Sequence, residues 1–176
     1  MKKLINKTII LSLFVALTGC NDWLDVSPKA DMKAEDLFGT EAGFRDALVG
    51  VYALMCGTNS YGRDLTYGYL DVLAQYYNSP LKTTSSGYEH NFKNAAEYKY
   101  TEKTEESRIS SIWSNHFSAV ANINQAMLFI DENKGVFTSP EVHDVYKGEF
   151  LALRAFLHFD LLRLFGKSYV SGAGAK

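Results

Sequence analysis

The feature that most restricts the fold is a pair of long stretches in which apolar side chains recur every three or four residues. The first stretch extends from about Glu105 to Glu132, and the second from about Ser139 to Phe165. Such spacing places the apolar side chains on one face of a helix, and that face must be buried against a neighbour. Because only residues 133–138 join the two stretches, we expect two long helices packed antiparallel.

The apolar face of each expected helix can be assigned from the same spacing. In the first helix it comprises Ile109, Ile112, Trp113, Phe117, Val120, Ile123, Met127 and Leu128. In the second it comprises Val142, Val145, Tyr146, Phe150, Leu153, Leu157, Leu161 and Leu164, and is widened by Phe156, Phe159 and Leu162. So wide a surface predicts burial against more than one neighbour. Ser139 suits the N-cap, Pro140 the first helical position and Gly166 the C-cap.

Two further helices are expected nearer the N-terminus. Ala34 to Cys56 carries apolar residues at helical spacing, although Thr40 is an alternative N-cap from which the helix would start later. Asp64 to Tyr77 is predicted as a helix with one shared face, which holds Leu65, Tyr69, Val72, Leu73 and Tyr76.

Residues 78–102 differ from the rest of the chain. They are rich in Ser, Thr, Asn, Gly and Tyr and show no sustained apolar period, so we expect an irregular excursion, which at this length is usually functional or disordered. No alternating strand pairs are visible elsewhere. The predicted fold class is therefore all-α, built from helical hairpins.

The first twenty residues have the pattern of an export signal. Lys2, Lys3 and Lys7 precede a short apolar run that ends in Leu17-Thr18-Gly19-Cys20. The run is too short for a bilayer-spanning helix, and a charged start, an apolar core and small residues are typical of a secretory signal. The last four residues resemble the bacterial lipobox, in which the Cys is lipidated and becomes the mature N-terminus. We therefore expect a signal peptide over residues 1–19, a lipid anchor on Cys20, and localisation in the outer membrane.

The remaining domain boundaries follow from the helical pattern. Residues 20–33 are polar, contain Pro28, and are expected to be a lipidated tether. The helical domain is expected over 34–166, and 167–176 is a short tail.

Composition excludes several classes of function. Without residues 1–19, the chain keeps 15 basic and 20 acidic residues, a formal charge of −5, which is unlike a nucleic-acid-binding surface. Cys56 has no internal disulfide partner once Cys20 is lipidated, and we expect it to be a small buried residue. No metal-binding Cys/His cluster, glycine-rich phosphate loop or nucleophile motif is present. The sequence therefore predicts no metal and no cofactor, and it carries no motif that would point to an enzyme.

Single polar residues on the long helices are interpreted as structural. His116 lies on or beside the apolar face and is expected to be a satisfied interior histidine. Arg154 and His158 share a face at i,i+4 and are expected in a polar seam between helices.

The excursion contains the candidate ligand-binding residues, which are Tyr88, Asn91, Phe92, Tyr98 and Tyr100. Aromatic rings can stack on the apolar face of a sugar while amides and hydroxyls bind its hydroxyl groups, which is the usual combination of an apolar wall and a few polar groups. The alternative is that these aromatic side chains hold the excursion against the helices.

Several motifs, in order along the chain, resemble the SusD/RagB family. The second long helix is similar to the signature helix of that family, and earlier segments match its start, its first helix and a Trp-containing helix. These matches are Leu153-Arg154-Ala155, Asp160-Leu161 and Phe165-Gly166 within residues 146–166, then Trp23-Leu24-Asp25-Val26-Ser27-Pro28, Glu41-Ala42-Gly43-Phe44, Leu48-Val49-Gly50-Val51-Tyr52, Ile112-Trp113 and Ile123-Asn124-Gln125-Ala126.

This resemblance implies a scaffold of tetratricopeptide-like hairpins, although no repeat near 34 residues aligns convincingly here. It also implies a lipoprotein that binds oligosaccharides or other nutrients at the cell surface. Such a protein forms a lid over a TonB-dependent outer-membrane transporter of the SusC type. In the family the excursion often contributes to the ligand face. Because members are much longer, we expect this chain to be an N-terminal portion that lacks much of the ligand site.

Two other classes of function remain open. A helical scaffold of the cell envelope would bind protein partners without binding glycans. An all-α glycosidase would need two carboxylates about 5–9 Å apart, whereas Glu102, Glu105 and Glu106 are interpreted as a solvated helix start.

Overall fold

The computed structural model describes residues 33–77 and 91–167, and its regular elements there are all helices. In chain order they are α2 (Ala34–Leu37), α3 (Glu41–Met55), α4 (Tyr69–Leu73), α5 (Lys93–Ala96), α6 (Lys103–Phe129), the 3₁₀ helix η2 (Lys134–Val136) and α7 (Pro140–Phe165). The expected all-α fold class is confirmed.

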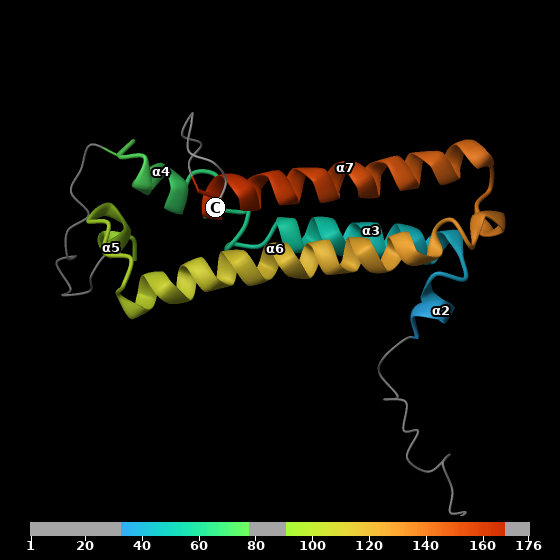
Figure 1. Cartoon of the computed structure of the whole chain (residues 1–176), viewed down its shortest axis with the longest axis horizontal. Helices are drawn as coiled ribbons and strands as arrows, with labels where there is room; N and C mark the ends of the chain where they lie inside the picture. Colours follow the sequence, from blue (N-terminus) through green and yellow to red (C-terminus); the bar gives the residue numbers. More distant parts are fainter. Residues whose placement is uncertain (1–32, 78–90, 168–176) are drawn as a thin grey trace, which may run out of the picture. The chain divides into compact units, whose positions relative to one another are not determined.

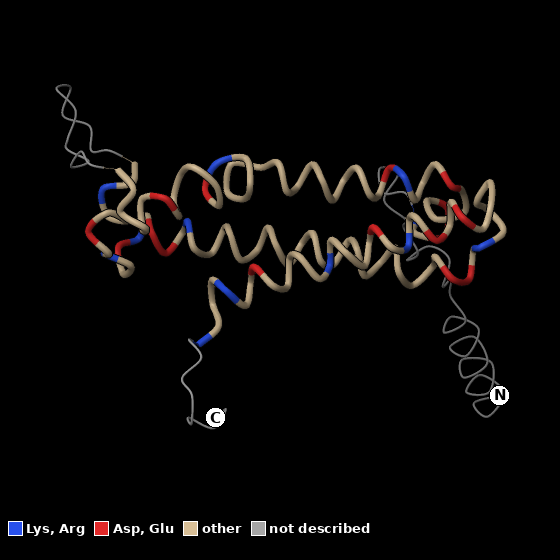
Figure 2. Tube along the Cα trace, turned by 90° about the horizontal axis from the view of Figure 1, so that it is seen from above, with Lys and Arg blue, Asp and Glu red and all other residues tan. Residues whose placement is uncertain are grey.

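The three long helices pack against one another. α3 runs antiparallel to α6, which in turn runs antiparallel to α7, and each of the three contacts the other two (Figure 1). The short connection after α6 contains η2 and leads directly into α7. The antiparallel packing of α6 and α7 is therefore as expected from the length of this connection. The charged residues of α6 lie in its first turns and the rest of that helix is uncharged, whereas α7 carries charged residues along its length (Figure 2).

The start of α3 corrects the single helix expected over 34–56. The chain leaves α2 after Leu37, and Thr40, in an extended conformation, caps α3 by accepting a hydrogen bond from the Gly43 amide at 3.1 Å. The alternative start at Thr40 is therefore the correct one. Gly43 fits here because a Cβ atom at this position would lie 1.6 Å from the carbonyl oxygen of Leu37.

The helix expected over 64–77 is much shorter than the apolar spacing indicated. Turns occupy most of residues 56–68, and only Tyr69–Leu73 is helical. One cause is the close approach of the chain to itself, since a Cβ atom on Gly62 would lie 2.2 Å from the Cys56 carbonyl oxygen. Leu65, Tyr69 and Val72 are still buried, because the turn and the short helix present them to the same side.

The expected excursion contains a short helix. Residues 78–90 lie outside the described part of the chain, whereas Lys93–Ala96 forms α5 and buries Ala95. The expectation of wholly irregular structure over 78–102 is therefore wrong for its second half.

The two long helices begin and end close to the predicted positions. α6 starts two residues before Glu105 and ends three residues before Glu132. At the start of α7 the Ser139 hydroxyl accepts from the Val142 amide at 3.4 Å, and Pro140 occupies the first turn. Gly166 follows the last turn and donates its amide to the Leu162 carbonyl oxygen at 2.8 Å.

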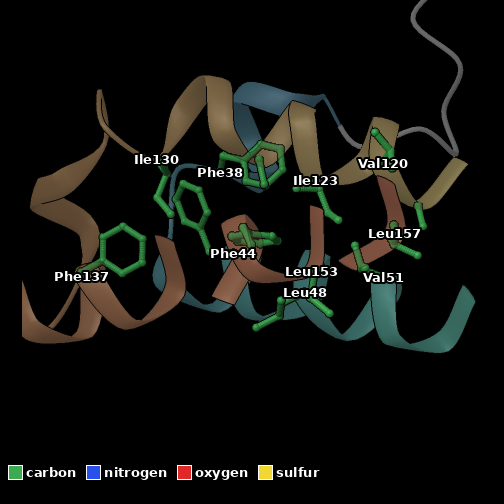
Figure 3. Close-up of a cluster of buried hydrophobic side chains, with 13 residues drawn as sticks. Phe38, Phe44, Leu48, Val51, Val120, Ile123, Ile130, Phe137, Leu153 and Leu157 are labelled. Atoms are coloured by element: carbon green, nitrogen blue, oxygen red, sulfur yellow. The ribbon is translucent and has the colours of Figure 1, made fainter. Parts of the chain in front are cut away.

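The main core fills the space between α3, α6 and α7. Figure 3 shows the side chains of Phe38, Phe44, Ile130 and Phe137 together near one end of this space, with Val51, Val120 and Leu157 farther along. Burial of such side chains contributes roughly 1.5–3 kcal/mol each relative to exposure. A second cluster, formed by Leu65, Tyr69, Val72, Ala95 and Ile112, joins the turn, α4 and α5 to α6.

Several residues that the sequence assigned to buried faces are exposed. On α6 these are Trp113, Phe117 and Leu128, and on α7 they are Val145, Phe156, Phe159 and Leu162, with exposed fractions from 39% to 66%. Each helix buries one face among the described residues, so side chains on the flanks of a wide stripe reach solvent. Cys56, expected to be buried, is also exposed, because it follows the last turn of α3.

Candidate functional site

A polar cavity lies between the turn after α3 and the first turns of α6. It has a volume of about 380 Å³, within the range of small-ligand sites. Every side chain that lines it is polar or charged. The lining comprises Thr58, Asn59, Arg63, Asp64, Asn91, Thr104, Ser107, Arg108 and Ser111.

Asp64 organises the charged side of this cavity. Its carboxylate is 1% exposed, and it accepts a hydrogen bond from Arg63 Nε on one oxygen at 2.7 Å and from Arg108 Nη1 on the other at 3.4 Å. Arg108 also donates through Nη2 to Asn91, at 3.1 Å to the backbone oxygen and 2.9 Å to the side-chain oxygen. One buried carboxylate thus fixes two guanidinium groups, and Arg108 ties α6 to the residues that precede α5.

Phe92 lies beneath both guanidinium groups. The Arg108 guanidinium carbon is 4.5 Å from the ring centroid and that of Arg63 is 5.5 Å away. Such cation–π contacts contribute about 0.5–2 kcal/mol each. The ring is partly buried against the second core cluster, so its contacts are those of a side chain that holds the segment to α6.

Glu105 lies below the cavity and is completely buried. Its closest cation is Arg108, with Nε 3.7 Å from Oε2, and neither carboxylate oxygen has a hydrogen-bond partner among the described residues. Burial raises the pKa of Glu105, although Arg108 opposes this effect. The protonated form is therefore favoured relative to an exposed glutamate.

A second, shallower cavity continues along α6. It has a volume of about 410 Å³ and shares Asn59, Ser107 and Ser111 with the first. Its other lining residues are Ser110, Ser114, Asn115 and Ser118. The two cavities therefore form one polar groove, with the arginines at the end nearer the start of α6.

Exposed tyrosines lie on three segments, which are the turn before α4, the residues after α4 and the residues after α5. This tyrosine-rich surface consists of Tyr67, Tyr76, Tyr77, Tyr98 and Tyr100, which are 45% to 75% exposed. Several of the rings are fixed by their hydroxyl groups, since Tyr67 donates to the Gly62 carbonyl oxygen at 2.9 Å, Tyr98 to that of Leu73 at 2.9 Å, and Tyr77 to that of Tyr67. The surface therefore presents ring faces whose positions are largely set in advance.

The predicted ligand residues separate into three groups. Asn91 lines the polar cavity and Phe92 lies under its arginines. Tyr98 and Tyr100 contact each other, with ring centroids 6.1 Å apart, and belong to the tyrosine-rich surface. Tyr88 and the expected lipid attachment residue, Cys20, lie outside the described residues.

Sequence reasoning missed the charged members of the cavity. Arg63, Asp64 and Arg108 carry no motif, and a charged residue in a turn or a first helical turn normally faces solvent. The one available signal was that Arg108 falls between Glu105 and Ile109 on the buried side of its helix.

A separate polar cluster joins the turn after α3 to both long helices. Tyr61 donates its hydroxyl to Asp160 Oδ2 at 2.7 Å, and His116 Nε2 lies 3.2 Å from the same hydroxyl. His116 Nδ1 is 3.0 Å from the Ile112 carbonyl oxygen, so this fully buried histidine is satisfied, as expected. Burial lowers the pKa of His116, and burial together with the Asp160 hydrogen bond raises that of Tyr61.

The other predicted polar seam is looser. Arg154 donates to the Asn124 side-chain oxygen of α6 at 3.2 Å, whereas His158 is exposed.

Within the described ranges, no three His, Cys, Asp or Glu side chains are arranged to hold a metal ion. None of the helices in those ranges is long and apolar enough to cross a membrane.

Comparison with known proteins places these features in a family. The SusD-like family model, described as starch-binding and associating with the outer membrane, matches residues 22–175. The SusD-like protein P2 of Formosa agariphila is 29% identical over 163 residues, which cover 91% of this chain and 30% of that protein. The chain thus spans about 30% of the length of this curated relative. No solved structure matches the chain.

Proposed function

Because this chain belongs to the SusD-like family, we propose that it is a glycan-binding lipoprotein of the outer membrane that captures oligosaccharides at the cell surface and partners a TonB-dependent transporter. The chain spans about 30% of the length of the SusD-like protein P2, so it carries a part of this function.

The tyrosine-rich surface is the observation that supports glycan binding best. Sugars present apolar C–H faces that pack on aromatic rings, and hydroxyl groups that need polar partners nearby. The rings of Tyr67, Tyr77 and Tyr98 are held by hydrogen bonds from their hydroxyls to backbone carbonyls, so binding a sugar costs little additional side-chain entropy. Tyr88, which the sequence also favoured, stays a candidate on the same excursion.

Calorimetric titration of the full chain with maltoheptaose and with a panel of neutral oligosaccharides tests this proposal. Tyr100→Ala removes an exposed ring whose hydroxyl has no hydrogen bond within the described part of the chain, and Tyr67→Ala removes a second exposed ring, whose hydroxyl donates to the Gly62 carbonyl oxygen. We expect each to weaken binding about tenfold while the melting temperature changes little. Tyr52→Ala on α3 is the matched control, since Tyr52 is 39% exposed and contacts Glu149 of α7. Equal losses in the control and in the two test variants would reject the tyrosine-rich surface as a glycan site.

Anchoring is proposed to depend on Cys20. Cells fed a labelled fatty acid should label the wild-type chain, and Cys20→Ala should abolish the label and release the chain from the membrane fraction. Cys56→Ala is the control, because Cys56 is exposed at the end of α3. Retention of label in Cys20→Ala would contradict the anchor.

The partner and the alternative function are separated by two measurements on the same protein. Co-purification with a TonB-dependent barrel from outer-membrane extracts is expected if the chain acts with a transporter. A protein scaffold without glycan binding would co-purify in the same way but give no heat in the titrations. Co-purification together with oligosaccharide binding therefore supports nutrient capture, and co-purification alone supports the scaffold.

A further inference from the structure

The polar cavity differs from the tyrosine-rich surface in its chemistry. Its lining contains no aromatic or aliphatic side chain, and Phe92, the ring next to it, has its face covered by Arg108. A neutral sugar ring would find hydroxyl and amide partners here but no apolar wall. The cavity is therefore suited to a polar or charged substituent of a ligand more than to the ring itself.

Arg63 has unused hydrogen-bonding capacity directed by fixed contacts. Its Nε is held by Asp64 at 2.7 Å and its guanidinium lies over Phe92. Its two terminal nitrogens have no hydrogen-bond partner among the residues that the structure describes, and the side chain is 34% exposed. A guanidinium held through Nε presents its terminal N–H groups as a planar fork, which matches the two oxygens of a carboxylate or sulfate group.

The surrounding charges favour an anion. Arg63 and Arg108 are opposed in the lining only by Asp64, and both oxygens of Asp64 are already occupied by these arginines. Glu105 is not part of this lining, and its buried carboxylate faces Arg108, with Nε 3.7 Å from Oε2. Thr104 and Ser107 line the cavity from the first turns of α6, near the positive end of that helix dipole.

From this arrangement we propose that the cavity binds the anionic group of an acidic glycan, a uronic carboxylate or a sulfate ester, with Arg63 as the direct contact. This inference rests on the proposed glycan binding and adds the ligand class. Arg108 is a positioning residue, since its terminal nitrogens are committed to Asp64 and Asn91.

The first test compares ligands on the full chain. Trigalacturonate carries carboxylates, its fully methyl-esterified form has the same skeleton without charge, a κ-carrageenan tetrasaccharide carries sulfate esters, and maltotriose is neutral. We expect at least one charged probe to bind ten times more tightly than both neutral probes, with an affinity that falls as the salt concentration rises. The preferred charged probe identifies the source of the anion. Equal affinity for trigalacturonate and its methyl ester, with no binding of the sulfated probe, would overturn the proposal.

The second test compares variants. Arg63→Gln should weaken binding of the preferred charged probe about tenfold or more and leave the binding of maltotriose unchanged, and Arg63→Lys should restore part of the loss. Arg45→Gln is the matched control, because Arg45 is an exposed arginine on α3 paired with Asp46 at 3.3 Å. Equal effects of Arg63→Gln and Arg45→Gln would refute the role of Arg63. If Arg63→Gln lowers the melting temperature, the role of Arg63 is judged from Arg63→Lys, whose affinity for the preferred charged probe is compared with that of the wild type.

The two tests also separate this inference from the function on which it depends. Binding of neutral probes without preference for the anionic ones leaves the proposed function standing and removes the acidic-ligand inference. Absence of binding for all four probes overturns both.

Discussion

Replacing Gly43 by alanine tests the junction between α2 and α3. An alanine Cβ atom would lie 1.6 Å from the Leu37 carbonyl oxygen and 2.7 Å from its carbonyl carbon, so the backbone must separate by about 2 Å to restore an ordinary contact of ~3.5 Å. This shift strains the cap in which Thr40 accepts from the Gly43 amide. Overpacking costs about 1–3 kcal/mol and loss of the cap about 1 kcal/mol. The free energy of unfolding should therefore fall by about 2–4 kcal/mol.

Thermal unfolding followed by circular dichroism measures this loss. For a chain of this size, the melting temperature should fall by roughly 2–4 °C for each kcal/mol. Gly50→Ala is the matched control on the same helix, since no atom lies within 4 Å of its added Cβ atom. It should raise the stability by up to about 1 kcal/mol, because alanine favours a helix over glycine. A Gly43→Ala variant as stable as Gly50→Ala would refute the packing argument.

Three further predictions concern the caps and the buried polar cluster. Tyr61→Phe removes the hydrogen bond to the buried Asp160 and should lower the free energy of unfolding by about 1–3 kcal/mol in urea titrations, whereas no change would show that water replaces the hydroxyl. Because burial lowers the pKa of His116, the unfolded chain binds a proton more readily, so stability should fall as the pH decreases below about 6.5. His116→Gln should flatten this dependence and exposed His158→Gln should preserve it; the opposite pattern would reject the assignment. Thr40→Ala should cost about 1 kcal/mol, measured by thermal melting, and an unchanged melting temperature would show that the cap adds nothing.

The parts of the fold that the sequence predicted well depend on local physics. The bounds of α7 follow from Ser139, Pro140 and Gly166, and each of these residues acts at a helix end whatever packs elsewhere. The antiparallel arrangement of α6 and α7 follows from the short connection. The errors arise where distant contacts decide. Leu65 and Val72 are buried as expected, but backbone turns bring them together where a continuous helix was predicted.

Exposure was harder to predict than helix position. Trp113 was assigned to the core and is 45% exposed, although its ring contacts Phe117 and Phe165 with centroids 4.6 and 4.9 Å away. Apolar spacing indicates which residues share a face, but the width of the face that becomes buried depends on the number of neighbours. The described residues supply α6 and α7 with neighbours on one side.

The candidate site shows the same division between local and distant effects. Asn91 and Phe92 were predicted as ligand-binding candidates from the composition of their segment, and this segment does reach the polar cavity. Arg63 and Arg108 are 45 residues apart in sequence, and only the fold brings both to Asp64. The sequence shows which residues of an irregular segment are suited to ligand binding. It does not show that an arginine in a turn and an arginine on a distant helix contact the same carboxylate.

The buried polar residues are concentrated near the candidate site. Asp64 lines the polar cavity and Glu105 is buried next to it, and His116 and Asp160 form the neighbouring cluster with Tyr61, whereas the core near Phe44 and Phe137 is apolar apart from His143 at its edge. Buried charges stabilise a fold less than apolar side chains of similar volume, but they fix specific geometry when their partners are satisfied. The apolar half of the bundle is thus the main source of stability. The polar half holds the turn after α3 in one conformation, and through Asp64 it also holds the arginine on which the proposed recognition of an anionic glycan depends.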